Sequence, residues 1–333
     1  MKVFIAGGTG LLGYHGALEL LHRGHDVRTA ALPDIALGQW WPSQIQVEHA
    51  DLFALDARAL SRLMEGCDAL VYALGPDDRE TPPAPAYAYF HERLVLGSGR
   101  VIAAAREAGV RRCTVLGSYY ATFQREWPRK RLADHHPYVR CRVEQAERAM
   151  AEGHGRMAVN VLELPYIFGA MPQRVPLWKK LLFDPLRRMP VILYPDGGSA
   201  MTTAEHVGQA IAGAVERGGD GERHPIGDEN LTWDEMLHTM LDALGLQKRI
   251  VHLPALVGML FGYAQRRGDA RRGRERGLNH GVLFRDTMSE RMYLDPVPSS
   301  QALGHDCGGV REAIAATVRA CYWNRLAGAE AAA

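Results

Sequence analysis

A glycine-rich turn near the amino terminus is the first feature that predicts a chemistry. Residues 7–13 read Gly-Gly-Thr-Gly-Leu-Leu-Gly, between an apolar run at 3–6 and an amphipathic run at 11–23. Glycine tolerates positive φ and lets the backbone approach a ligand, and the N–H groups that open the following helix attract phosphate. Because the glycines stand between a strand and a helix, this turn is predicted to bind the pyrophosphate of a dinucleotide.

Two other polar clusters could also do chemistry. Residues 265–277 hold six arginines against Asp269 and Glu275, a local charge of +4. The interpretation we prefer is an exposed mobile loop, and the alternative is a clamp for a phosphorylated or acidic substrate. The adjacent pair His135 and His136 is expected to serve a loop or helix cap, with acid/base chemistry as the alternative.

Composition excludes several classes of protein. The chain has 333 residues with 39 Lys and Arg against 38 Asp and Glu, a formal net charge of +1. This balance gives no global field that would attract nucleic acid or an anionic membrane as the partner. The five cysteines are scattered and form no C-x-x-C pair, which argues against a metal site and a disulfide framework.

The ends of the chain and its apolar stretches bear on location. The opening segment is a short apolar run that leads directly into glycines, without the cleavage site of a signal peptide. The apolar stretch at 253–263 is shorter than the ~20 residues that a membrane span requires. A cytoplasmic protein with a small-molecule substrate is therefore expected.

The elements that must position the glycine turn alternate between strands and helices. Strands are predicted at 3–6, 26–32, 46–50, 69–74, 113–116 and 158–164, and helices at 11–23, 56–65, 89–108 and 137–152. Such alternation predicts βαβ units with a parallel sheet covered on both faces. The fold class is therefore α/β, a Rossmann-type doubly wound sheet with a smaller C-terminal substrate-binding domain.

The pattern becomes less regular after Pro165. Several prolines between 172 and 195 predict an irregular excursion, and helices are predicted again at 204–217 and 232–244, the second opened by a capping box of Thr232 and Glu235. The expected cofactor domain spans 1–165 plus about 200–228. The substrate domain takes about 166–199 and 229–325, and 326–333 form a disordered tail.

Several short segments, in order along the chain, resemble the extended short-chain dehydrogenase/reductase family, the NAD(P)-dependent epimerase/dehydratase group. They are the spacing Gly7-x-x-Gly10-x-x-Gly13, Asp51-Leu52, the strand that ends at Gly75, Gly97-Ser98, Gly117-Ser118 and Pro165–Gly169. The resemblance covers roughly residues 1–245. It implies a bound NAD or NADP held by Gly7, Gly8, Thr9, Gly10, Leu11, Leu12, Gly13, Asp51, Leu52, Ala73, Leu74, Gly75, Tyr138, Arg142, Pro165 and Ile167.

The family signature Tyr-x-x-x-Lys is matched by Tyr138 and Arg142, with arginine in place of lysine. By resemblance, Tyr138 transfers the proton to or from the substrate oxygen, Ser118 orients that oxygen, and Arg142 tunes Tyr138 and binds ribose. Arginine keeps the charge that lowers a phenol's pKa but cannot release its own proton. The family's relay asparagine is matched by Leu94, so the proton path differs.

The sequence does not decide between NAD and NADP. An acid at the end of the second strand would bind the ribose 2′-OH, and an arginine would accept a 2′-phosphate. The expected position holds neither, although Asp34 and Arg28 lie nearby.

The function expected from these residues is an NAD(P)-dependent oxidoreductase that transfers hydride on a small alcohol or carbonyl substrate. Two alternatives remain: a sugar-nucleotide epimerase or dehydratase that retains NAD, and a dinucleotide-binding sensor or scaffold protein that is altered in catalysis. The resemblance also implies a homodimer, paired through the helices at 89–108 and 137–152.

Overall fold

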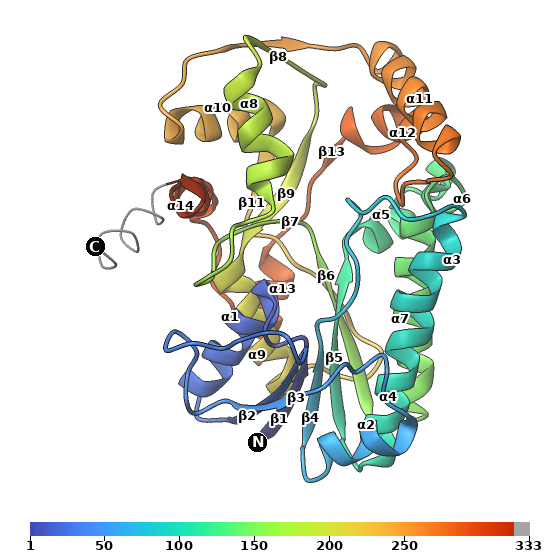
Figure 1. Ribbon diagram of the computed structural model, residues 1–333, viewed down its shortest axis with the longest axis vertical. Helices are drawn as coiled ribbons and strands as arrows, with labels where there is room; N and C mark the ends of the chain where they lie inside the picture. The colour runs from blue at the N-terminus through green and yellow to red at the C-terminus, as the bar shows by residue number, and fades with distance from the viewer. Residues whose placement is uncertain (323–333) are drawn as a thin grey trace.

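A seven-stranded parallel sheet forms the larger lobe of the computed structural model, which describes residues 1–322 (Figure 1). The strand order is β10-β6-β5-β4-β1-β2-β3, and each neighbouring pair is parallel. The strands are β1 (Lys2–Ala6), β2 (Asp26–Ala31), β3 (Gln46–His49), β4 (Ala69–Tyr72), β5 (Arg112–Ser118), β6 (Ala158–Leu164) and β10 (Arg223–Pro225). This is the doubly wound Rossmann-type order, so the predicted fold class is confirmed.

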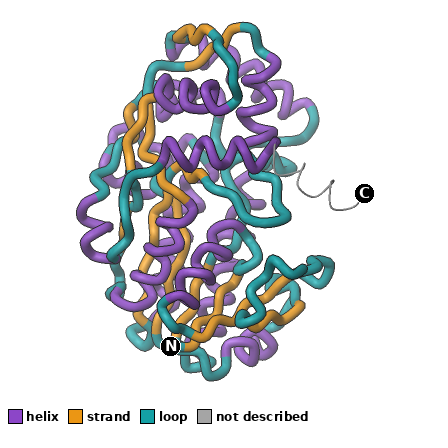
Figure 2. Tube along the Cα trace, turned by 90° about the vertical axis from the view of Figure 1, so that its left-hand side faces the viewer, coloured by secondary structure: helices purple, strands orange, loops and turns teal. Residues whose placement is uncertain are grey.

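Helices bury both faces of this sheet, which explains why its strands are continuously apolar. Val3 and Ile5 point into one core with α1 (Leu11–His22) and α9 (Ala204–Arg217). Phe4 points into the other core with α2 (Ala57–Met64), α4 (Gly97–Glu107) and α7 (Pro137–Gly153). Successive residues of a strand face opposite sides, so each strand supplies both cores. Figure 2 shows these strands with helices on either side.

The helix predicted at 89–108 is present but divided. It consists of α3 (Ala86–Phe90), a π-helical segment η1 (His91–Leu96) and α4. The Ser98 hydroxyl donates to the carbonyl of Val95 across the junction at 3.2 Å. α7 begins at Pro137, as predicted, because proline is suited to the first helical turn.

A smaller sheet organises the second lobe. Its central strand β9 (Gly198–Thr203) pairs with β11 (Glu229–Thr232) in antiparallel fashion and with β13 (Arg291–Met292) and β7 (Tyr166–Phe168) in parallel. α10 (Trp233–Ala243), α14 (Val310–Tyr322), η3 (Lys179–Phe183) and α8 (Asp184–Arg188) pack around it. The capping box of Thr232 and Glu235 is present at the start of α10, as predicted.

Further short elements connect the lobes and extend the second one. They are α5 (Tyr120–Glu126), η2 (Pro128–Lys130), α6 (Leu132–His135), β8 (Val191–Tyr194), β12 (Arg249–His252), α11 (Ala255–Arg271), α12 (His280–Leu283), η4 (Phe284–Met288) and α13 (Val297–Leu303). β8 and β12 form a separate parallel pair that leads into α11 (Figure 1).

The arginine-rich run corrects one prediction. Residues 265–271 continue helix α11 rather than form a mobile loop. The segment that follows is also held in place, because Arg276 Nε donates to Asp269 at 2.7 Å and Arg274 donates to the carbonyl of Thr81 at 3.0 Å.

The tail predicted at 326–333 lies outside the described residues, and the division into a cofactor domain and a substrate domain stays a prediction. Among residues 1–322, no helix has the length and apolar character needed to cross a membrane.

Candidate active site

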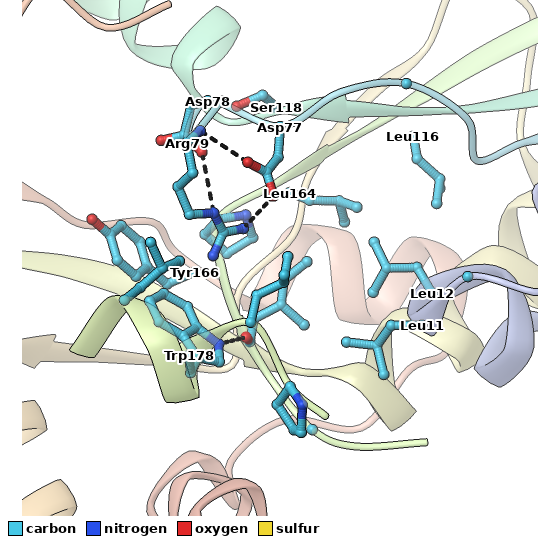
Figure 3. Close-up of a pocket in the computed structure, with 18 of the residues that line it drawn as sticks. Leu11, Leu12, Asp77, Asp78, Arg79, Leu116, Ser118, Leu164, Tyr166 and Trp178 are labelled. Atoms are coloured by element: carbon cyan, nitrogen blue, oxygen red, sulfur yellow. Dashed lines mark hydrogen bonds and ion pairs between the residues drawn. The ribbon is translucent and has the colours of Figure 1, made fainter. Parts of the chain in front are cut away.

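A cavity of about 720 Å³ lies between the carboxyl ends of the large sheet and the second lobe (Figure 3). One wall is formed by residues 10–13, 73–75, 116–118 and 164–167, and the opposite wall by 169–182. β1 and β4 are neighbours at the centre of the sheet, where the strand order reverses direction. This crevice is where doubly wound sheets bind their ligands.

The glycine turn is shaped for close backbone approach. Gly7 has a φ of +96°, and a Cβ there would lie 2.8 Å from the carbonyl oxygen of Ala73. A Cβ on Gly13 would lie 2.2 Å from the carbonyl oxygen of Gly7. α1 starts after Gly10, which offers no side chain as a cap, so the first N–H groups of the helix are available to an anion. The turn therefore fits a dinucleotide pyrophosphate.

Most of the residues predicted to contact the cofactor line this cavity. They are Gly10, Leu11, Leu12, Gly13, Ala73, Leu74, Gly75, Tyr138, Arg142, Pro165 and Ile167. Gly7, Gly8 and Thr9 belong to the turn but are not part of the lining, and the Gly8 amide donates to Thr29 Oγ1 at 3.1 Å.

Asp51 and Leu52 lie apart from the cavity lining. Leu52 is buried in the core beneath α2 and α4, and Asp51 accepts a hydrogen bond from the Phe53 amide at 2.9 Å. Their predicted contact with the cofactor remains a prediction. The residues considered for the ribose 2′ position do not decide between NAD and NADP either, since Arg28 donates to the carbonyl of Glu65 at 3.4 Å and Asp34 is exposed.

Tyr138 and Arg142 face each other inside the cavity. They lie one turn apart on α7, and Arg142 Nε donates to the Tyr138 hydroxyl oxygen at 2.8 Å. The same guanidinium donates to Gln145 Oε1 at 2.8 Å and to the carbonyl of Leu116 at 3.2 Å. These two further bonds hold the arginine in place, so its charge is fixed beside the phenol.

The surroundings of Tyr138 keep its hydroxyl protonated. Burial raises the pKa of Tyr138, the carboxylates of Asp78 and Asp77 raise it further, and the Arg142 charge lowers it in part. The pKa stays above its ordinary value of 10.0, so the phenol is neutral at pH 7. Because Arg142 donates to the phenol oxygen, the hydroxyl hydrogen is left to donate to another acceptor.

Ser118 shares the cavity but is not hydrogen-bonded to Tyr138. It ends β5, and its Oγ accepts a weak hydrogen bond from the Tyr120 amide at 3.4 Å. The neighbouring Tyr119 hydroxyl lies 3.0 Å from Ser199 Oγ, and the Tyr120 ring packs edge-on against Tyr138. Both tyrosines combine aromatic packing with a place in the cavity lining.

Three charged residues after β4 reach the cavity and were not predicted. Asp77, Asp78 and Arg79 follow Gly75, and Arg79 pairs with Asp77 at 3.1 Å and with Asp78 at 3.8 Å (Figure 3). Burial raises the pKa of Asp78 despite the nearby Arg79 charge. The available signal was a run of three charged residues in the loop that follows the carboxyl end of a buried strand.

The histidine pair contacts a buried carboxylate outside the cavity. His135 Nδ1 and His136 Nε2 lie 2.9 and 3.2 Å from the same carboxylate oxygen of Asp286, and neither histidine lines the cavity. Burial alone would raise the pKa of Asp286, but hydrogen bonds from His136, Arg285 and His135 hold it well below its usual range. His280 is the histidine in the cavity wall, and burial lowers its pKa to about 4.

The wall supplied by the second lobe is mainly apolar. Trp178 donates its indole N–H to the carbonyl of Ile167 at 2.7 Å and stacks on Tyr166 with ring centroids 5.7 Å apart. Beside it the lining continues with Met171, Val175, Leu177, Leu181, Leu182 and Tyr194. The cavity therefore offers an apolar surface opposite the tyrosine and its carboxylate neighbours.

The sequence of this chain is similar to a protein family and to a characterised enzyme. A family model described as NAD(P)H-binding matches residues 7–154. Over 76% of both chains, the sequence is 28% identical to a 4-hydroxy-2-methyl-3-oxo-4-farnesyl-3,4-dihydroquinoline-1-oxide ketoreductase of Stigmatella aurantiaca.

Solved structures share the fold at low identity. The crystal structure of gox2253 matches with a TM-score of 0.77 at 19% identity, covering 98% of each chain. A nucleoside-diphosphate-sugar epimerase of Pseudomonas aeruginosa, PA4631, matches with a TM-score of 0.69 at 19% identity and 98% of each chain. A dTDP-glucose 4,6-dehydratase of Streptomyces venezuelae, solved with NAD, matches with a TM-score of 0.68 at 19% identity and 98% of each chain.

Proposed function

We propose that the chain is an NAD(P)H-dependent ketoreductase of the extended short-chain dehydrogenase/reductase family, because residues 7–154 match an NAD(P)H-binding family model and the whole chain shares its fold with an epimerase and a dehydratase. Its substrate would be a carbonyl compound with an apolar body. The observation that carries this proposal is the hydrogen bond of 2.8 Å from Arg142 to Tyr138 within the cavity beside the glycine turn.

The proposed chemistry assigns a step to each residue. The glycine turn holds the pyrophosphate of the cofactor, which supplies the hydride when bound. Tyr138 donates its proton to the carbonyl oxygen as charge develops there, and Ser118 orients that oxygen. Arg142 stabilises the resulting phenolate and positions the ring. Because a guanidinium does not release its proton in proteins, Tyr138 must be reprotonated by another route.

The apolar wall favours a carbonyl substrate with an apolar body over a sugar nucleotide. The stretch 171–182 lines the cavity with Met171, Val175, Leu177, Trp178, Leu181 and Leu182. Arg79 is paired with Asp77 and Arg142 is hydrogen-bonded to Tyr138, so Arg174 is the lining arginine that has no ion pair among the described residues. A single unpaired arginine beside so many apolar side chains suits the diphosphate of a sugar nucleotide less well than an apolar carbonyl compound. The similarity to a ketoreductase named for a farnesylated substrate supports the same substrate class.

The test is a turnover assay with a matched tyrosine control. NADH and NADPH oxidation would be followed with ketones of increasing apolar size, and we expect Tyr138→Phe to lose about 10²- to 10⁴-fold in kcat/KM while cofactor binding persists. Tyr87→Phe is the control, because Tyr87 bonds Glu144 outside the cavity. A Tyr138→Phe protein with full turnover would refute the mechanism.

The other hypotheses have their own measurements. Ultraviolet absorbance of cofactor released from the purified protein would identify retained NAD, as an epimerase or dehydratase requires. Cofactor binding without hydride transfer to any ketone would favour a sensor or scaffold protein. The homodimer through η1, α4 and α7 is kept as a proposal, to be measured by light scattering.

A further inference from the structure

Helix α11 presents apolar side chains outward. Leu256, Leu260 and Tyr263 follow one another at spacings of four and three residues, which places them on one face, and they are 68%, 65% and 52% exposed. The adjacent Phe261 is 63% exposed. A surface helix normally directs its apolar stripe toward the core, so this helix has the reverse arrangement.

The inner face of α11 explains the reversal. It is formed by Gly258, Gly262 and the buried Asp269. A Cβ on Gly258 would lie 2.0 Å from the Phe284 ring, and a Cβ on Gly262 would lie 1.9 Å from the carbonyl oxygen of His280. The helix thus docks on the protein through its glycines, and its large apolar side chains are left for another partner.

Further exposed apolar side chains lie at the same end of the molecule. Of the fifteen large apolar side chains that are exposed among residues 1–322, six belong to α11 or β8. They include Val191 and Leu193 on β8, the strand that pairs with β12 just before α11. β8 and α11 lie at the end of the molecule opposite the N-terminus (Figure 1). Such clustering indicates an interaction surface rather than scattered surface residues.

Unpaired positive charge adjoins this apolar face. Arg266, Arg267, Arg271 and Arg272 are exposed in the last turns of α11 and directly after it, and the described residues include no ion pair to any of them. The acid within the helix, Asp269, is buried and bonded to Arg276. The net charge of +1 for the whole chain therefore conceals a local cluster of arginines.

We propose that this surface, which we call the α11 face (Leu256, Leu260, Phe261, Tyr263 and the four arginines), is a peripheral binding site for an anionic lipid bilayer. Its apolar side chains would enter the boundary between headgroups and acyl chains. The arginine stems lie along that boundary while their guanidinium groups bind lipid phosphates.

Charge decides between a bilayer and a second copy of the chain. In a two-fold interface the same patch meets itself, and the α11 face of a second copy would supply no exposed acidic side chain to these arginines, because Asp269 is buried and bonded to Arg276. An anionic bilayer supplies opposite charge next to an apolar layer, which matches both halves of the α11 face. The inference concerns the outside of the second lobe and is independent of the proposed reaction.

The test is co-sedimentation of the full chain with vesicles of phosphatidylcholine alone and of phosphatidylcholine with phosphatidylglycerol. We expect binding to the anionic vesicles that weakens as salt is added. The double variant Leu260→Glu/Phe261→Glu should bind at least about tenfold less, since it places charges on two side chains that would enter the apolar layer of the bilayer. Replacing the four arginines with glutamine should abolish the preference for anionic lipid.

Control variants separate lipid binding through the α11 face from misfolding and from self-association. Val297→Glu changes a side chain that is 51% exposed on α13, away from the α11 face, and should bind as the unaltered chain does. Unchanged thermal unfolding and cofactor binding would show that the variants are folded. The proposal is overturned if anionic vesicles are not bound, or if light scattering shows a dimer that the double variant dissociates.

Discussion

The two walls of the cavity offer opposite kinds of contact surface. At the glycine turn the contact surface is backbone, and even one added carbon would overlap the carbonyl of Gly7 or Ala73. In the second lobe the contact surface consists of side chains such as Trp178 and Leu181. A backbone site suits a group common to all dinucleotides and tolerates little substitution, while a side-chain wall can change its specificity residue by residue.

The largest effect is expected from a side chain added at the glycine turn. Gly13→Val places its side chain within 2.2 Å of the Gly7 carbonyl oxygen, and we expect at least about 100-fold weaker cofactor binding, because close overlap of this kind costs roughly 3 kcal/mol. Fluorescence titration with NADH and NADPH measures the loss. Gly268→Ala on α11 is the control, because no atom lies within 4 Å of its added Cβ, and equal losses in both variants would contradict the assignment.

Arg142 and Tyr138 line the same cavity as the two walls. Arg142→Met removes both the charge and the donated hydrogen bond, and we expect kcat/KM to fall by about 10- to 100-fold, the contribution of a hydrogen bond to a charged group. The variant should also show a higher Tyr138 pKa, since Arg142 lowers it.

Two further variants on α7 test whether the effect is specific to Arg142 and whether it depends on charge. Arg140→Met breaks an exposed pair with Glu144 and should leave turnover unchanged. Arg142→Lys keeps the charge and should recover most of the activity. If Arg142→Met and Arg142→Lys lose activity equally, the planar fork of arginine, rather than its charge, is what the site requires.

Removing the charge of Asp78 should shift the pH profile of kcat/KM. Ketone reduction requires the protonated phenol, so activity falls as pH rises through the pKa of Tyr138. Asp78 raises that pKa, and Asp78→Asn should therefore move the alkaline limb of kcat/KM to lower pH. The exposed Asp242→Asn serves as the control in the same titration, and an unmoved limb for Asp78→Asn would exclude electrostatic coupling to Tyr138.

The smallest effect is expected at the side-chain wall. Leu181→Ser should raise KM for large apolar ketones by about fivefold, because a bound substrate would lose part of its apolar contact with this side chain, with kcat nearly unchanged. A small water-soluble ketone is the matched substrate, for which KM should not change. A fall in kcat for both substrates would instead place Leu181 close to the reacting atoms.

Local patterns were sufficient for most of the large sheet and for part of the site. Alternating strands and helices predicted the parallel order, and the spacing of Tyr138 and Arg142 predicted that they share a helical face. The arginine-rich run was predicted wrongly as a loop, because its charge is typical of a solvated loop although the run is continuous with the apolar residues that precede it in α11.

The sequence by itself determined the Rossmann-type order and the position of the glycine turn, because helix and strand periods and glycine spacing are encoded over a few neighbouring residues. Only the tertiary structure decided that Asp77, Asp78 and Arg79 line the same cavity as Tyr138. It also decided that the leucines of α11 are exposed. Those outcomes depend on contacts between segments far apart in the chain. The burial and electrostatic surroundings of a group are set by all of its neighbours in space, and most of these neighbours are distant in the sequence.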